Sequence, residues 1–192
     1  MKLHSQFFAL AGLALGLVST ASAAVETYAA DPAHSSVNFS IRHFFSEVPG
    51  RFTKFTATIT VDRDHLENSS AEATIDIASV DTAAPQRDAH LQKPEFFDAQ
   101  KFPTMTFKSK SWKKTGEDTF DVTGDLTIKG VTKEVVLKVT SLGFGPGMQG
   151  AMLSGWKCAT TIHRDDFGVS AFPKVVGADA EITINVEADM KK

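Results

Sequence analysis

The chain has 192 residues, of which 42% are hydrophobic and 22% charged, and its formal net charge is −3. These proportions are typical of one globular domain and exclude disordered, collagen-like and coiled-coil chains. Because the charge gives no basic surplus, nucleic acid is not an expected partner. The single cysteine, Cys158, excludes an intrachain disulfide bond.

The first 23 residues are predicted to be a cleavable signal peptide. Lys2 and His4 form a short basic start, residues 7–18 are an apolar run, and Ala21-Ser22-Ala23 carries the small residues that signal peptidase recognises. Cleavage after Ala23 would leave one exported domain, residues 24–192. No later apolar run is long enough to span a bilayer as a helix, so stable membrane insertion is not expected.

The rest of the chain is dominated by alternation of apolar and polar residues, the period of half-buried β-strands. Between residues 88 and 100 the apolar spacing is helical instead, with Pro94 interrupting it, and the Gly-rich residues 143–147 are expected to form a loop. The pattern predicts an all-β fold, an eight-stranded antiparallel lipocalin-like β-barrel with a short helical insertion around residues 88–100; a β-sandwich is the alternative. The alternating segments are residues 36–41, 55–61, 71–77, 105–108, 120–128, 135–139, 156–162 and 178–188.

Such a barrel can turn its apolar face inward, around a cavity, or outward, into a membrane. An outer-membrane barrel needs two aromatic girdles, which one Tyr and two Trp cannot supply. The apolar register is therefore expected to face a lumen wide enough for one small ligand. Inward alanines would leave room there, or simply fit the barrel taper. The residues predicted to line the lumen and contact the ligand are Phe39, Ile41, Ile59, Phe107, Val122, Leu137 and Ile184.

Little in the sequence predicts catalysis or a metal site. There is no Gly-x-Ser-x-Gly motif, and Cys158 lies within a strand on the apolar face, a poor position for a nucleophile. The histidines after residue 23 lack the paired spacing of metal ligands. We therefore expect no catalytic residue, no metal and no cofactor other than a bound lipid.

Three clusters of Arg, His and Asp lie at strand ends or in loops, at residues 42–43, 87–90 and 164–166. Each cluster either pins a loop through Arg–Asp pairs or binds an anionic headgroup at the cavity mouth, because a guanidinium matches phosphate bidentately. Arg87 and His90 share a face of the predicted helix and are the first candidates for headgroup binding. Arg42 and His43 are the second candidates, although neighbours on a strand point opposite ways and only one can face inward.

Several longer motifs follow one another in order along the chain. They are Ser79-Val80-Asp81-Thr82, Arg87-Asp88-Ala89-His90-Leu91, Glu95-Phe96-Phe97-Asp98, residues 102–109, residues 123–133, and Arg164-Asp165-Asp166-Phe167-Gly168-Val169 before a closing alternating strand. This ordered string resembles the YceI-like family of polyisoprenoid-binding proteins, from about residue 28 to residue 188. No single motif is specific, but their order is.

The resemblance implies an extended lipocalin-like barrel in the periplasm that holds a long apolar ligand. Ligands of the family are isoprenoid chains, including quinone and polyprenyl phosphate types, and fatty-acid-like amphiphiles. The resemblance implies no enzymatic activity, and some family members are associated with stress. We therefore expect a soluble periplasmic carrier for an isoprenoid, quinone or similar amphiphilic lipid; a homodimer is left open.

Two alternatives stay open at this point. The first is an enzyme that acts on a small amphiphile, with His90 and either Asp88 or Asp166 as acid–base groups. The second is a stress-related structural or interaction module whose barrel is packed solid and binds no ligand.

Overall fold

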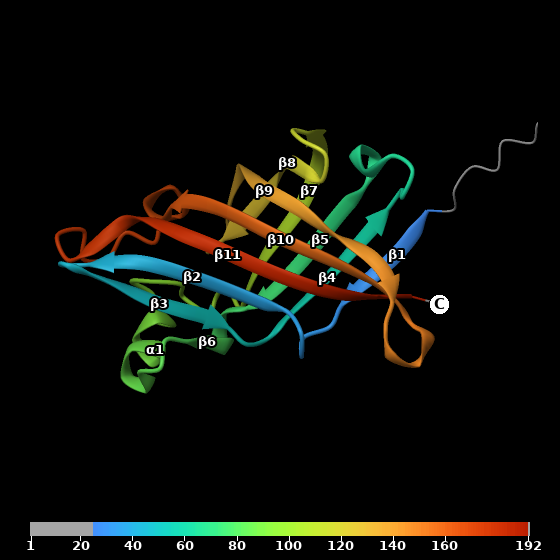
Figure 1. Ribbon diagram of the computed structural model, residues 1–192. Helices are drawn as coiled ribbons and strands as arrows, with labels where there is room; N and C mark the ends of the chain where they lie inside the picture. Colours follow the sequence, from blue (N-terminus) through green and yellow to red (C-terminus); the bar gives the residue numbers. More distant parts are fainter. Residues whose placement is uncertain (1–24, 192) are drawn as a thin grey trace, which may run out of the picture.

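The computed structural model describes residues 25–191, and the predicted signal peptide, residues 1–23, lies outside this range. The described chain forms one continuous antiparallel sheet of eleven strands (Figure 1). The strands are β1 (Glu26–Ala30), β2 (Ser36–His43), β3 (Ser46–Phe52), β4 (Phe55–Val61), β5 (Ser70–Asp76), β6 (Val80–Asp81), β7 (Thr104–Lys114), β8 (Thr119–Ile128), β9 (Val131–Pro146), β10 (Met152–His163) and β11 (Val176–Met190). The helices are α1 (Pro85–Leu91) and the 3₁₀ turns η1 (Leu66–Asn68), η2 (Ile77–Ser79), η3 (Met148–Gly150) and η4 (Arg164–Phe167).

Eight of these strands close into a barrel. The order around the ring is β1-β4-β5-β7-β8-β9-β10-β11, and β1 pairs with β11 to complete it. Closure leaves no free edge at this end of the molecule, where the sheet would otherwise be open to pairing with other chains. The predicted eight-stranded antiparallel barrel is confirmed.

Beyond the closed ring, and after a break in the strand, β2 continues the row begun by β1 and β3 continues the row begun by β4. β1 and β2 lie in succession along β11, with Ala30 opposite Ala188 and Ser36 opposite Asn185. β4 pairs with β1, and β3 pairs with β2, so the same two rows continue to the far end. The alternation of residues did not predict β1, β3 or the two-residue β6. Pro49 lies within β3, and proline is tolerated there because β3 is an edge strand along most of its length.

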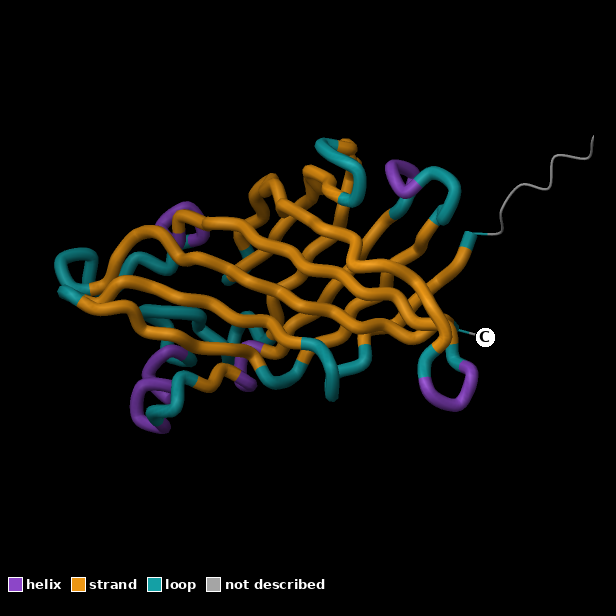
Figure 2. Tube along the Cα trace, viewed as in Figure 1, coloured by secondary structure: helices purple, strands orange, loops and turns teal. Residues whose placement is uncertain are grey.

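At the far end, the segment between β6 and β7 forms α1 and the turns that follow it, and it lies below β2 and β3 in the view of Figure 1 and Figure 2. Helix α1 begins at Pro85, where the missing N–H of proline costs nothing, and ends at Leu91. The predicted insertion therefore begins three residues early, and turns rather than helix follow to residue 103. Its side chains Phe96 and Phe97 pack onto the core.

The predicted loop at residues 143–147 is mostly strand. β9 continues through Gly143 and Gly145 to Pro146 and stays paired with β10. Gly143 has φ of 121°, a conformation that side chains other than glycine rarely adopt. The glycines therefore let the strand bend rather than end it.

None of the helices within residues 25–191 has the length and apolar character needed to cross a bilayer.

Candidate ligand-binding site

The barrel encloses a cavity of about 240 Å³. Strands β2, β4, β5 and β7–β11 all contribute to its wall, and the segment after α1 adds Phe96 and Phe97. The seven side chains predicted to line the lumen, Phe39, Ile41, Ile59, Phe107, Val122, Leu137 and Ile184, all lie on this wall. Their contact with a ligand stays a prediction.

Small residues on neighbouring strands make the space. Ala57 on β4 lies directly opposite Ala73 on β5, and both line the cavity together with Ala71 and Ala180. Ala188, in contrast, is fully buried in the core at the closed end. On β8, the Phe107 ring occupies the space beside Gly124, because a Cβ at this position would lie only 2.5 Å from Cζ of Phe107. The alanines therefore leave cavity volume unfilled, whereas the Phe107 ring fills the space beside Gly124.

Aromatic rings close the cavity at the end where β1 lies. Trp112 and Trp156 pack edge to face with ring centroids 5.6 Å apart, and Phe144 packs edge to face on Trp156 at 5.5 Å. Trp112 was not predicted on the wall, because an irregularity in the β7–β8 register between Ser109 and Ser111 shifts the alternation. Its indole Nε1 is buried without a hydrogen-bond partner among the described residues.

Cys158 lies on the cavity wall and behaves as an apolar residue. Burial raises the pKa of its thiol to about 12, so the reactive thiolate is scarce near neutral pH. This matches the prediction from its register and gives no support to nucleophilic catalysis.

The positively charged side chain on the cavity wall is that of Arg164, the first residue of η4. It is 6% exposed, and the guanidinium donates hydrogen bonds from Nε to the carbonyl oxygen of Gly177 (2.7 Å), from Nη1 to that of Val169, and from Nη2 to that of Val176 (3.2 Å). The nearest carboxylate oxygen, on Asp165, lies 3.9 Å away. A guanidinium has five N–H groups, so these three hydrogen bonds leave two, and Asp165 provides only a distant ion-pair partner.

Other polar residues at the wall direct their side chains elsewhere. Glu72 forms an ion pair with Lys108 at 2.8 Å, and Thr160 donates a hydrogen bond to the carbonyl oxygen of Val136 (2.9 Å). Asn38 donates to Ser36 Oγ at 2.9 Å. Arg164 therefore supplies the positive charge at the otherwise apolar cavity.

The structure does not bring Arg87 or His90 to the cavity wall. Arg87 donates from Nε to Oγ1 of Thr82 and from Nη2 to its carbonyl oxygen, both at 2.7 Å. His90 Nε2 lies 3.0 Å from Oε1 of Glu95, and its ring packs on Phe96. Both residues brace the segment around α1, and a headgroup role for them has no geometric support.

Arg42 and His43 are likewise absent from the wall and exposed at the end of β2. Arg42 Nη1 donates to the carbonyl oxygen of Phe44 at 3.0 Å, and the His43 ring packs edge to face on Phe44. The cation on the wall comes instead from the third cluster. The sequence alone does not reveal which arginine lies on the cavity wall, because the burial of Arg164 depends on carbonyl groups of the chain that returns to β11.

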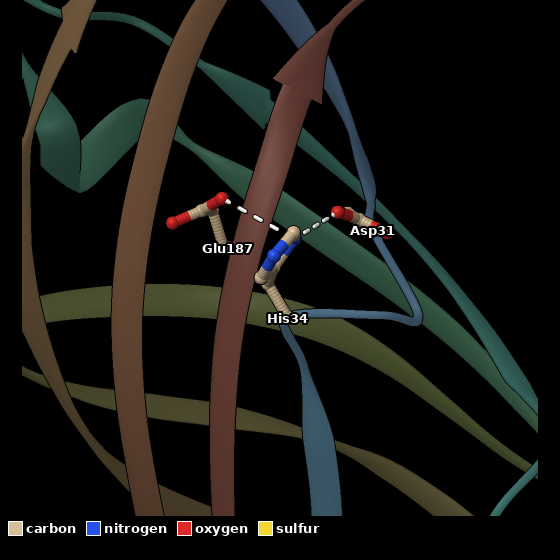
Figure 3. A group of neighbouring side chains, drawn as sticks. All are labelled: Asp31, His34 and Glu187. Carbon is tan, nitrogen blue, oxygen red and sulfur yellow. Dashed lines mark hydrogen bonds and ion pairs between the residues drawn. The ribbon is translucent and has the colours of Figure 1, made fainter. Parts of the chain in front are cut away.

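The fold also gathers Asp31, His34 and Glu187, whose spacing gave no signal (Figure 3). Their candidate ligand atoms lie within 4.8 Å of one another. His34 Nδ1 is already hydrogen-bonded to Asp31 Oδ2 and lies 3.8 Å from Glu187 Oε1. We interpret the trio as an ion-pair clamp that holds the break between β1 and β2 against β11.

This clamp is expected to be strongest between about pH 4 and pH 6.5. The hydrogen bond with Asp31 raises the pKa of His34 above 6.5, and the same bond lowers the pKa of Asp31 below 3.8. The contribution of His34 to stability is therefore complete below pH 6.5 and is lost as the pH rises through its raised pKa. The contribution of Asp31 is present above pH 3.8 and is lost as the pH falls through its lowered pKa.

NMR titration of the imidazole resonances measures the effect directly. Asp31→Asn should lower the pKa of His34 toward its ordinary value and leave His163 unchanged. The matched control is Asp179→Asn, because a hydrogen bond to Asp179 raises the pKa of His163. A His34 pKa that does not respond to Asp31→Asn would contradict the clamp.

Comparisons with family models, curated proteins and solved structures agree with one another. A family model described as a YceI-like domain matches residues 28–188. Protein YceI of Salmonella arizonae is 36% identical over 195 residues and covers 100% of both chains. The crystal structure of Burkholderia cenocepacia BcnA has a TM-score of 0.76 at 27% identity, covering 82% of this chain and 98% of BcnA. A polyisoprenoid-binding domain from Saccharophagus degradans, implicated in plant cell wall breakdown, shares the fold, with a TM-score of 0.63 at 17% identity over 85% of this chain and 98% of that domain.

Proposed function

Because the chain belongs to the YceI-like domain family, we propose that it is a periplasmic carrier of one polyisoprenoid, quinone or similar amphiphilic lipid. The observation that carries this proposal is the apolar cavity of about 240 Å³ that runs between the aromatic end and Arg164. The polyisoprenoid-binding domain of Saccharophagus degradans, which has the same fold, supports the choice of ligand class.

The energetics of burial agree with this role. Each buried methylene contributes about 0.8 kcal/mol, so one five-carbon isoprene unit contributes roughly 3–4 kcal/mol before the costs of association. A few units suffice for tight binding, and longer chains add little because affinities saturate. The cavity therefore selects for an apolar chain more than for its length.

In this proposal the polar end of the lipid lies at Arg164. The two free N–H groups of the guanidinium suit a phosphate, carboxylate or quinone carbonyl oxygen. An anionic headgroup would also add a closer counter-ion to the one that Asp165 supplies at 3.9 Å.

The enzyme alternative has less support from the arrangement of its proposed residues. Asp88 Oδ1 accepts hydrogen bonds from the backbone N–H and the hydroxyl of Thr82, and His90 is paired with Glu95. Neither residue lies on the cavity wall, and Asp166 does not either. A solid-packed module is disfavoured by the open cavity.

Mass spectrometry of an organic extract of the purified protein tests the ligand. We expect one prenyl or similar long-chain lipid per chain and no product of turnover. Fractionation of cells and amino-terminal sequencing test the location, with a mature chain that starts at Ala24 as the expected result. Extracts without lipid from protein purified free of detergent would contradict the proposal.

Cys158 offers a second, independent measurement. A small thiol reagent is expected to label it slowly in the lipid-loaded protein and at least tenfold faster after the lipid has been extracted, because an acyl or prenyl chain covers the wall. Cys158→Ser supplies the unlabelled background, and urea-unfolded protein supplies full reactivity. Equal labelling with and without lipid would place the ligand elsewhere.

A further inference from the structure

Three phenylalanines protrude from the end of the barrel where α1 lies. Phe45 is fully exposed, and Phe44 and Phe172 are each 51% exposed. Phenylalanine has no polar tip, and monomeric proteins expose grouped apolar side chains chiefly where they bind something. Phe44 and Phe45 form the turn between β2 and β3, and Phe172 lies in the connection from η4 to β11, both at the left end of Figure 1.

The fold holds these side chains together and next to the cavity. The backbone N–H of Phe44 donates to the carbonyl oxygen of Val175 (2.9 Å), and that of Val175 donates to the carbonyl oxygen of Phe172 (2.9 Å). The Phe44 and Phe45 rings stack at 6.4 Å, and Phe172 stacks at 5.9 Å on Phe96, a residue of the cavity wall. Phe172 thus packs on a residue of the cavity wall, and the turn that carries Phe44 and Phe45 is hydrogen-bonded to the connection that carries Phe172.

The local backbone disfavours phenylalanine at two of these positions. Phe44 and Phe172 have φ of 51° and 55°, in the left-handed region that bulky residues rarely adopt. Hairpin turns place glycine or asparagine at positions with positive φ for this reason, yet the β2–β3 turn has Phe44 there. A choice that opposes local preference in this way is typical of a functional position.

Positive charges flank the rings. Arg42 lies two residues before Phe44, and Lys174 lies two residues after Phe172. Glu47 lies opposite Arg42 in the strand register, but its carboxylate accepts a hydrogen bond from Ser40. Aromatic rings beside lysine and arginine match the interface of a bilayer that contains anionic lipids.

We propose that this tip, defined as Arg42, Phe44, Phe45, Phe172 and Lys174, docks on an anionic lipid bilayer and brings the Phe96 side of the cavity wall close to it. The inference rests on the proposed function, because it explains how a lipid enters and leaves. An apolar chain that moves directly from bilayer to cavity avoids exposure to water, whose unfavourable free energy would otherwise slow exchange.

Co-sedimentation with vesicles tests docking. The probe is a vesicle of phosphatidylcholine with about 30% phosphatidylglycerol, whose anionic headgroups give a negative surface that attracts basic residues, and it is compared with pure phosphatidylcholine. The wild type should bind the anionic vesicles, and binding should weaken as salt rises. Phe44→Asn with Phe45→Gly should lower binding at least tenfold, and these residues suit the turn, so the variant should fold.

Leu142→Ser with Met148→Ser is the matched control, because both side chains are exposed apolar groups. Leu142 lies near the end of β9 and Met148 lies in η3, within the β9–β10 connection at the right-hand end of Figure 1. This control should bind vesicles as the wild type does. A turn variant that binds equally well would overturn the proposal. So would a wild type that ignores vesicles but forms a dimer that the turn variant loses, since the tip would then be a contact between copies.

The lipid content separates this inference from the proposed function. If the turn variant carries its lipid after purification but exchanges it with vesicles at least tenfold more slowly, both proposals stand. If the wild type binds vesicles but carries no lipid, docking stands and the carrier function fails. A turn variant that exchanges lipid at the wild-type rate would overturn the role of the tip in transfer.

Discussion

Replacing Arg164 with leucine is expected to lower the free energy of unfolding by about 3–5 kcal/mol. The substitution removes the donors that satisfy the carbonyl oxygens of Gly177, Val169 and Val176, and each buried acceptor left unpaired costs about 1–3 kcal/mol, not additively. These bonds tie η4 to the start of β11, so their loss also opens the cavity at this end. Urea unfolding followed by far-UV circular dichroism measures the change.

Arg51→Leu is the matched control for this prediction. Arg51 is 61% exposed and pairs with Asp81 at 2.9 Å on the surface, so its replacement should change stability by less than about 1 kcal/mol. Equal small effects for the two variants would show that Arg164 is not a structural cation.

Arg164→Lys separates the role of Arg164 in ligand binding from its role in stability. Lysine keeps the charge but cannot reproduce the planar fork, so the affinity for a prenyl phosphate should fall about tenfold, the effect of losing roughly 1.4 kcal/mol from a charged hydrogen bond. A neutral prenyl quinone should be affected much less. Equal losses for both ligands would place the headgroup elsewhere.

Filling the cavity with Ala73→Trp is expected to reduce lipid affinity at least a hundredfold while stability changes by less than about 1.5 kcal/mol. Ala73 lies on the cavity wall between Ala57 on β4 and Phe107 on β7. An indole there would occupy space that the lipid chain needs, whereas a packed core would be strained by the added volume. Ala180→Trp should behave alike, because Ala180 also lines the cavity.

Thr74→Trp is the control for this experiment, since Thr74 is the exposed neighbour of Ala73 on the opposite face of β5. It should leave lipid affinity within about twofold, measured by displacement of a fluorescent fatty acid. Severe unfolding of Ala73→Trp would indicate a core that has no spare volume.

The alternation of side chains along each strand is enough to predict much of the cavity wall. A strand points successive residues to opposite faces, so the inward positions of Phe39, Val122 and Ile184 follow from local sequence. Charged and polar residues at turns separate most of the strands, whereas the glycines of residues 143–147 lie mostly within β9. The order of the motifs likewise indicates the family to which the chain belongs.

The alternation of side chains does not indicate where a strand breaks, where it bulges or with which strand it pairs. One extra residue near Ser109 moves Trp112 onto the cavity wall, and one continuous row of the barrel consists of β1 and β2 on either side of the turn that His34 clamps. Such features depend on hydrogen bonds between segments up to about 150 residues apart, as between Ser35 and Glu187.

The sequence by itself determined the class of fold, the apolar face of most barrel strands and the residue types available to a lipid. Only the tertiary structure decided which cation reaches the cavity. Arg164 is buried because the chain returning to β11 supplies carbonyl oxygens to its guanidinium, whereas Arg87 turns back to Thr82 within its own loop. Side-chain type and period are local properties of a chain, but burial of a charge depends on partners that only the complete fold brings within hydrogen-bond distance.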